Sequence, residues 1–299
     1  MKYFLFPLMI LLLGSFGCEK HETRLRIGII KPSLNHLPLD IAFQYEYLSP
    51  ADYEIHEFLS GWETNEALIN DKVDLAILPF TYIWLDAAKD RSIRIISCLE
   101  RESDALICQP DIQSLQELNN KSIGVLKAST LDIFTEAVCE KYSLQAEIIY
   151  FRTPLDMASA LSAGEVDAIC FYVPSLFHLH PFFNILHWIA RDFPRHPCCD
   201  LAASEKVIYS RKEDLKKIMA GLARSCEFIA RNPDSVYALV QILFSLEPDI
   251  ARKSVEKTVY HLALSTEDIL FETKMAEIMQ SRKYLDRTVA AEEVFYEIR

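Results

Sequence analysis

A hydroxyl-bearing turn is the first feature of the chain that could do chemistry. Ser129 and Thr130 follow an apolar, strand-like segment and precede a helical pattern over residues 131–141. The start of a helix offers unpaired N–H groups and the positive end of a dipole, so hydroxyls there suit a carboxylate, sulfonate or phosphate. Serine and threonine are also preferred helix caps, so an ordinary cap is the alternative. We predict ligand contacts from both residues.

A second polar turn occurs earlier in the chain, within PSLNHLP (residues 32–38). It also follows an apolar strand-like segment. We predict that Ser33, Asn35 and His36 contact a ligand there. The alternative is that the histidine is simply solvated, as loop histidines commonly are.

Two aromatic runs follow predicted strands. LPFTYIWLD contains Phe80, Thr81 and Tyr82, and CFYVPSLF contains Phe171 and Tyr172. Aromatic faces directed into a cleft can hold a planar ring between them, while hydroxyl groups orient it. The alternative is that these rings pack the core. We predict that all five residues contact a ligand.

The segment RHPCCDLAAS places His196 close to Cys198 and Cys199. Adjacent cysteines chelate a tetrahedral ion poorly, and the spaced cysteine pairs of structural zinc sites are missing. A vicinal disulfide is a strained alternative. We therefore expect no metal, and a segment that borders a cleft, with His196 as a ligand contact. The other cysteines beyond residue 18 mostly lie in apolar runs and are expected to be small buried side chains.

The overall composition excludes several functions. The net charge of −12 argues against nucleic acid as a partner, because nucleic-acid binding requires a basic surface. The chain has no Ser–His–Asp spacing, P-loop or HExxH motif. We expect no enzymatic activity and no cofactor.

An internal repeat indicates which elements position these residues. Residues 54–78 align without a gap with residues 147–171, with seven identities over 25 positions. Upstream of the two copies, RIGIIK (residues 26–31) resembles SIGVLK (residues 122–127). Each copy predicts strand, loop, helix, strand, helix and strand, which indicates parallel sheets covered on both faces. Ligands bind beyond the carboxyl ends of such strands, so two facing copies would share one cleft.

The remaining elements follow from shorter patterns. The repeated acids Asp74 and Asp167 precede buried strands, where we expect them to cap turns. Residues 184–189 and 206–210 are predicted strands. A helix is predicted in RKEDLKKIMAGLARSCEFIARNP (residues 211–233), where it stops at Asn232 and Pro233. Further helices are predicted over residues 235–246, 249–264 and 266–284, the last behind the cap candidates Ser265 and Thr266.

The front of the chain is typical of an export signal. An apolar stretch from Tyr3 to Leu13 is too short to span a membrane, which takes about 20 residues. Small residues and then Cys18 follow, which resembles a bacterial lipobox. Ser15 stands where a lipobox usually has leucine, and the bulky Phe16 stands where a small residue is usual. A cleaved signal without lipid and an uncleaved anchor are the alternatives.

Several pieces together resemble a known family. RIGII, EALINDKVDLAILP, DALICQPDIQSLQELNNKSIGVLKAST and ALSAGEVDAICFYVP, between residues 24 and 232, are similar to periplasmic solute-binding proteins of ABC importers. The branch is that of the nitrate, sulfonate and taurine binders and the thiamine-pyrimidine-synthase-like proteins. The chain departs from it where Ala128 replaces a usual glycine, and in lacking a tryptophan near residue 171.

The resemblance implies an α/β, bilobed, periplasmic-binding-protein-like (type II) fold with two lobes around a central cleft. The expected division is a signal peptide over 1–17, a tether over 18–23, lobe 1 over 24–103 plus about 205–299, and lobe 2 over 104–204. The lobes would hinge near residues 102–105 and 199–204.

The resemblance also implies a function: a lipid-anchored protein on the periplasmic or extracellular face. It would deliver a small planar or anionic solute, a thiamine-pyrimidine precursor or an organosulfonate, to ABC permease and ATPase subunits. The alternatives are a thiamine-pyrimidine-synthase-like enzyme that uses His196 and the cysteines, and a ligand-binding sensory module.

Overall fold

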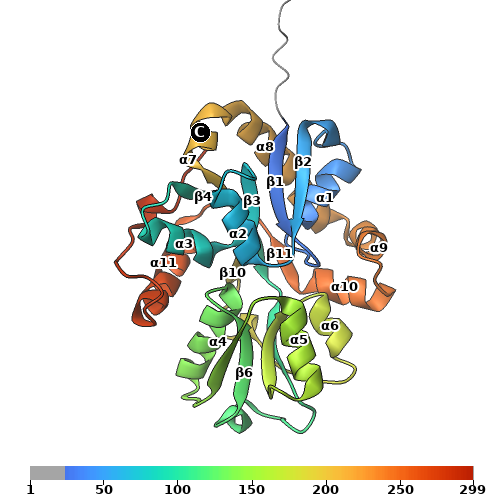
Figure 1. Ribbon diagram of the computed structural model, residues 1–299. Helices are drawn as coiled ribbons and strands as arrows, with labels where there is room; N and C mark the ends of the chain where they lie inside the picture. Colours follow the sequence, from blue (N-terminus) through green and yellow to red (C-terminus); the bar gives the residue numbers. More distant parts are fainter. Residues whose placement is uncertain (1–23, 299) are drawn as a thin grey trace, which may run out of the picture.

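A computed structural model describes residues 24–298 of the chain. The predicted signal peptide, the tether and Cys18 therefore lie outside the described residues. Within them the chain forms two lobes, each built on its own mixed sheet (Figure 1). The predicted bilobed α/β fold is confirmed.

The first lobe contains the six-stranded sheet. Its strands, in spatial order, are β11 (Thr258–Tyr260), β4 (Ile93–Glu102), β10 (Pro197–Ser204), β3 (Leu75–Pro79), β1 (Leu25–Ile30) and β2 (Tyr53–Phe58). Strands β1, β2 and β3 are parallel, and β10 runs antiparallel to both β3 and β4. Its helices include α1 (Leu37–Gln44), α2 (Gly61–Ile69), α3 (Phe80–Ala88), α7 (Glu205–Ser210) and α8 (Lys212–Arg231).

The second lobe contains the five-stranded sheet. Its order is β7 (Glu147–Phe151), β6 (Ser122–Leu126), β8 (Ala168–Tyr172), β5 (Asp104–Cys108) and β9 (Asn184–Trp188). The order β7-β6-β8-β5-β9 repeats the order β2-β1-β3-β10-β4 of the first sheet. Its helices are α4 (Thr130–Lys141), α5 (Pro154–Ala163) and α6 (Ser175–Leu179).

The remaining elements are helices and short 3₁₀ turns. The helices α9 (Pro233–Leu243), α10 (Pro248–Glu256) and α11 (Thr266–Ser281) complete the C-terminal part. The 3₁₀ turns are η1 (Pro50–Asp52), η2 (Leu115–Leu118), η3 (Ile189–Arg191) and η4 (Ala291–Glu293). Within residues 24–298, no helix combines the length and apolar character needed to span a bilayer.

The sequence repeat corresponds to a repeat of hydrogen bonding. Asp74 accepts the backbone N–H of Arg26 at 2.9 Å, and its repeat partner Asp167 accepts that of Ser122 at 2.9 Å. Each carboxylate thereby holds the start of the neighbouring strand. Both acids are structural, as the sequence predicts, but they bind the neighbouring strand rather than cap a turn.

Three sequence predictions need correction. Residues 206–210, predicted as a strand, belong to helix α7, which Ser204 caps by accepting the N–H of Val207. A five-residue apolar run does not distinguish strand from helix. The helix predicted over 249–264 ends at Glu256, and residues 258–260 form the edge strand β11 on β4 instead.

The third correction concerns the boundary between the lobes. Residues 197–204, assigned by sequence to lobe 2, form β10 in the middle of the six-stranded sheet. The return crossover therefore lies before β10, at residues 192–196, and not at 199–204. The outgoing crossover lies at Ser103, between β4 and β5, where the sequence predicts it. Glu102 and Ser103 have left-handed backbones there, with φ of 66° and 80°.

Candidate functional site

The candidate site is a pocket between the two lobes. Residues at the carboxyl ends of β1, β3, β6 and β8 meet there with the first residues of α2, α4 and α5. The lining consists of Ile30, Ser33, Asn35, Ser60, Gly61, Pro79, Tyr82, Glu100, Asp104, Leu126, Ser129, Thr130, Leu131, Pro154, Tyr172, Cys198 and Cys199. The cavity volume is about 40 Å³, space for only a few water molecules. A larger solute therefore requires the lobes to separate.

The start of α4 brings the predicted hydroxyls into the pocket. Ser129 and Thr130 both line it, but the Ser129 hydroxyl donates to the carbonyl of Leu126 at 2.6 Å. The backbone N–H of Ala128 donates to the carboxylate of Asp132 at 2.7 Å. A resident carboxylate therefore already lies at this helix end, which makes it a weaker site for an external anion.

The turn before α1 contributes two of its three predicted residues. Ser33 and Asn35 line the pocket, and the Asn35 amide donates to the sulfur of Cys199 at 3.4 Å. His36 is fully buried behind them, with Nδ1 2.9 Å from Asn35 Oδ1. Burial lowers the pKa of His36 to about 3, so it is neutral and orients Asn35.

Among the predicted aromatic residues, two tyrosines line the pocket. Tyr82 comes from the first lobe and Tyr172 from the second. The Tyr82 hydroxyl donates across the lobes to the carbonyl of Lys127 at 3.3 Å. The Tyr172 hydroxyl is buried and has no hydrogen-bond partner within residues 24–298, so it is available to a solute.

The other aromatic-run residues lie in the core. Phe80, Thr81 and Phe171 are buried and are not among the lining residues. Phe171 stacks on Tyr172 with ring centroids 5.2 Å apart, so it supports a lining side chain. Direct ligand contact from these three residues remains a prediction.

Two buried carboxyl groups that the sequence analysis did not select also line the pocket. Glu100 and Asp104 are 2% and 1% exposed. Burial, with the neighbouring Asp104, raises the pKa of Glu100 to about 8, and the Ser103 hydroxyl donates to it at 2.8 Å. Burial also raises the pKa of Asp104. Their position beside the crossover at Ser103 could have drawn attention to them.

The pocket contains no compensating cation. None of the lining residues, as the structure describes them, is lysine, arginine or histidine. His196 is buried: its Nδ1 lies 2.9 Å from the carbonyl oxygen of Phe193, its Nε2 lies 3.4 Å from Asp104, and its ring packs on Phe134. It stands behind Asp104 rather than on the pocket surface, so its contact with a ligand remains a prediction.

The cysteine pair lines the pocket as two separate thiols. The sulfur atoms of Cys198 and Cys199 are 3.9 Å apart, and burial contributes to a raised pKa for both. Such thiols are poor nucleophiles. Together with Glu100 they offer three ligand atoms within 4.8 Å, the one metal-compatible cluster on this pocket among the described residues.

A family model matches this architecture. The model described as "NMT1/THI5 like" covers residues 52–236, which include most of both sheets and most of the pocket lining. This chain belongs to the NMT1/THI5-like family. The sequence resemblance to the thiamine-pyrimidine-synthase-like branch is thereby confirmed.

Solved structures confirm the fold of this NMT1/THI5-like chain. It is similar to the alkanesulfonate-binding protein SsuA from Xanthomonas axonopodis pv. citri bound to MOPS, with TM-score 0.80 and 17% identity over 92% of this chain and 98% of that one. It is also similar to the ligand-binding component of an ABC-type import system from Staphylococcus aureus with zinc bound, with TM-score 0.80 and 15% identity over 92% and 97%.

A fungal protein has a similar fold to the NMT1/THI5-like chain. The Candida albicans CA3427 product, described as having the generic periplasmic binding protein fold, matches with TM-score 0.72 and 12% identity over 92% of this chain and 97% of that one. The search of curated proteins finds no match. The solved structures therefore establish the fold, and the pocket must indicate the solute.

Proposed function

We propose that this chain is an extracytoplasmic solute-binding protein that delivers a small planar solute to an ABC importer. The family and the fold support a binding role. The choice of solute depends on the composition of the pocket. Among the described residues, its lining contains Tyr82 and Tyr172 from opposite lobes and two buried carboxyl groups, but no lysine, arginine or histidine. We propose a thiamine-pyrimidine type of precursor as the solute.

The charge of the pocket favours a pyrimidine over a sulfonate. An aminopyrimidine offers N–H donors that Glu100 and Asp104 can accept, and a flat ring that fits between tyrosines. A sulfonate offers only acceptor oxygens and a negative charge. Burying that charge in a pocket whose described lining residues include no cation to pair with it is costly.

Titration calorimetry tests the proposal with an aminopyrimidine, a taurine-type sulfonate and nitrate. We expect binding of the aminopyrimidine, and Glu100→Gln should weaken it roughly 10- to 100-fold, because an amide NH₂ in place of a carboxyl oxygen leaves a buried N–H of the pyrimidine without an acceptor. The matched control is Glu63→Gln, outside the pocket lining. Sulfonate binding that Glu100→Gln strengthens would replace the proposed solute, and no binding at all would count against the proposal.

The enzyme alternative has weaker support. A pyrimidine-synthase-like reaction through His196 and the cysteines requires groups that reach the solute, and His196 lies behind Asp104 with its ring on Phe134. The thiols are protonated because burial contributes to raising their pKa values. We therefore propose a binding protein. A sensory module that hands the same solute to a receptor would share this pocket.

We also propose that Cys18 carries a lipid that holds the protein on the outer side of a membrane. There it can deliver the solute to the permease and ATPase subunits of the importer. The support is the lipobox-like sequence before Cys18. In a bacterial host, Cys18→Ser should move the protein from the membrane fraction to the soluble fraction after lysis. Unchanged membrane association of Cys18→Ser would contradict lipid anchoring, and the binding proposal would stand on its own.

A further inference from the structure

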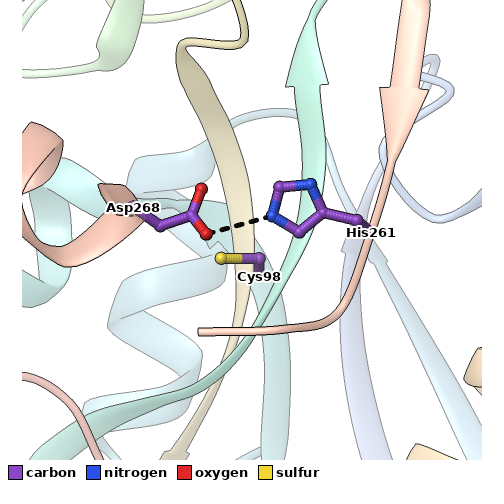
Figure 2. Close-up of side chains that lie close together, drawn as sticks. All are labelled: Cys98, His261 and Asp268. Carbon is purple, nitrogen blue, oxygen red and sulfur yellow. Dashed lines mark ion pairs between the residues drawn. The ribbon is translucent and has the colours of Figure 1, made fainter. Parts of the chain in front are cut away.

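We propose that Cys98, His261 and Asp268 form a binding site for a zinc-type divalent cation, separate from the interlobe pocket. Cys98 belongs to β4, His261 follows β11, and Asp268 lies in the first turn of α11 (Figure 2). One ligand atom from each residue lies within 4.8 Å of the others. None of the three lines the interlobe pocket.

The donor set matches zinc. A thiolate, an imidazole and a carboxylate are the three ligand types that Zn²⁺ accepts, with a water in the fourth position. In a tetrahedral site with metal–ligand bonds of about 2.0–2.3 Å, the ligand atoms are roughly 3.3–3.6 Å apart. His261 Nε2 and Asp268 Oδ2 are 3.3 Å apart, which lies in this range.

Access and burial are also suitable. The Cys98 side chain is buried, whereas the side chains of His261 and Asp268 are 19% and 15% exposed. An ion can therefore enter past the imidazole and the carboxylate. The capping box at the start of α11 uses Asp268 Oδ2, which accepts from the backbone and hydroxyl of Ser265. Asp268 Oδ1 is approached by Arg101 at 3.8 Å.

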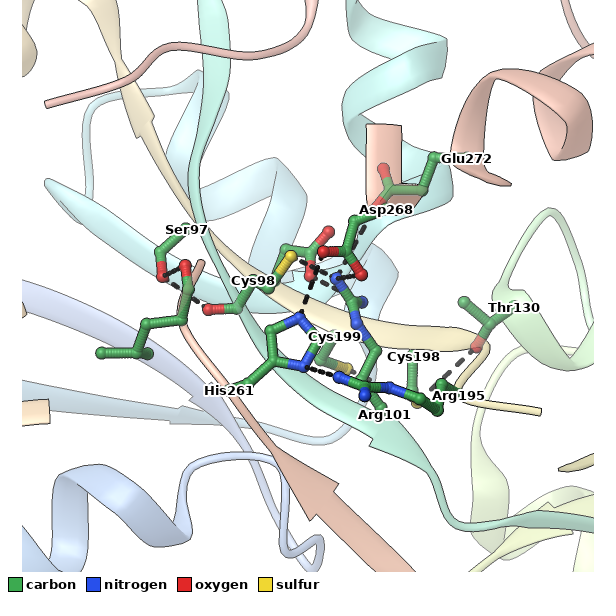
Figure 3. A network of polar contacts seen from close by, with 12 residues as sticks. Ser97, Cys98, Arg101, Thr130, Arg195, Cys198, Cys199, His261, Asp268 and Glu272 are labelled. Carbon is green, nitrogen blue, oxygen red and sulfur yellow. Dashed lines mark hydrogen bonds and ion pairs between the residues drawn. The ribbon is translucent and has the colours of Figure 1, made fainter. Parts of the chain in front are cut away.

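The surrounding charges favour an added cation. The buried guanidinium of Arg101 lies 3.8 Å from Asp268 and 3.9 Å from Glu272 (Figure 3). It also lies 3.0 Å from Asp200. One oxygen of Asp200 and one of Glu272 are buried without a hydrogen-bond partner in the described part of the chain. The carboxylate of Asp268 would attract a dication, whereas burial raises the pKa values of Asp200 and Glu272 and favours their neutral forms.

The positive charge of Arg101 repels a cation at this site, but the same charge stabilises the thiolate form of Cys98. Its Nη2 contacts the sulfur of Cys98. Zinc binding requires the thiol to lose its proton; burial raises the pKa of Cys98, and the guanidinium beside the sulfur partly opposes this increase. The released proton goes to solvent.

Arg195 competes with the ion for His261. Its Nη2 lies 3.2 Å from His261 Nδ1, and because a guanidinium can only donate, Nδ1 is the acceptor and Nε2 carries the proton (Figure 3). A cation at Nε2 requires the proton to move to Nδ1 and Arg195 to move away. Arg195 is exposed, so its side chain can turn into solvent.

The test measures zinc binding to the mature chain by equilibrium dialysis and elemental analysis, and cobalt substitution by absorption. We expect one zinc per chain and a sulfur-to-cobalt charge-transfer band. Cys98→Ser and Asp268→Asn should each weaken binding at least about tenfold, since even the loss of an outer partner costs roughly 10- to 100-fold. Cys98→Ser should also remove the band.

Matched variants keep the test decisive. Cys226→Ser and the double change Cys198→Ser with Cys199→Ser should retain the zinc and the band. Arg195→Ala should strengthen zinc binding, because it removes the side chain that competes for His261. This variant changes only an exposed side chain and none of the zinc ligands. It therefore still tests the site if Cys98→Ser fails to fold. Absence of zinc from the wild-type chain, or zinc lost from the Cys198/Cys199 variant but not from Asp268→Asn, would overturn the proposal.

Discussion

At the scale of single residues, Asp40 is held in an unfavourable environment for a carboxylate. It lies in α1, with its carboxylate 3.4 Å from Nε2 of the buried His36, and its side chain is 24% exposed. Burial raises its pKa from 3.8 to about 7, with Glu57 adding to the shift and Lys31 opposing it. Because burial also lowers the pKa of His36 to about 3, the pair is neutral near pH 5.

This shift predicts how stability depends on pH. The folded state binds the Asp40 proton more tightly than the unfolded state, so stability falls as pH rises from about 4 to about 7. The full shift corresponds to at most about 4 kcal/mol. Asp40→Asn should flatten this part of the curve of unfolding free energy against pH, measured by urea denaturation.

An exposed acid provides the control for Asp40. Glu227→Gln, on the outer face of α8, should keep the wild-type slope between pH 4 and pH 7. An Asp40→Asn variant with the wild-type slope would show that Asp40 titrates normally.

At the scale of elements, the pocket depends on how closely α2 approaches β3 and α3. Gly61 begins α2, directly after its cap Ser60, which accepts the N–H of Glu63. A Cβ on Gly61 would lie 2.7 Å from Cδ of Pro79 and 2.9 Å from Cε2 of Tyr82. Only glycine lets the helix start this close to a pocket tyrosine.

Gly61→Ala should therefore affect both stability and binding. We expect a loss of about 1–3 kcal/mol from overpacking, because Pro79 has to shift. Displacement of Tyr82 should weaken solute binding, measured by calorimetry. Gly164→Ala is the control: its added Cβ meets open space, although its φ of +72° costs some stability, so it should leave binding unchanged. Equal binding losses in both variants would contradict this role for Gly61.

At the scale of the whole molecule, the C-terminal segment links the lobes. Helix α11 packs against both α3 of the first lobe and α4 of the second. Just beyond it, the Tyr284 hydroxyl donates to the buried carboxylate of Asp132 at 2.7 Å, and Arg282 pairs with Glu136 at 2.7 Å. These contacts hold α4 toward the first lobe and help keep the pocket narrow.

Tyr284→Phe should shift the solute-free protein toward a more open form. It removes one hydrogen bond to a buried carboxyl group, at a cost of about 1–3 kcal/mol. Small-angle X-ray scattering should show a larger radius of gyration. Tyr150→Phe is the matched control, because it removes the bond between the Tyr150 and Tyr284 hydroxyls and leaves the one to Asp132. An unchanged radius in Tyr284→Phe would contradict the link.

The sequence alone determined the fold class, the repeat and part of the pocket. Strand and helix periodicity is local, and the ends of parallel strands meet at one edge, so Ser33, Asn35, Ser129 and Thr130 could be placed together before any coordinates. Asp74 and Asp167 could be assigned to structure for the same reason.

Only the tertiary structure decided which side chains line the pocket. Neighbouring residues such as Phe80 and Tyr82 have similar local patterns, and packing of α3 against the sheet buries both but places only Tyr82 in the pocket lining. In the sequence, Glu100 and Asp104 have no feature that separates them from ordinary exposed acids. In the fold, β4 and β5 bury both beside the crossover. Likewise, Cys98 meets His261 and Asp268 only because β11 and α11 return to β4 from more than 160 residues away. Such contacts depend on chain topology, which local patterns do not encode.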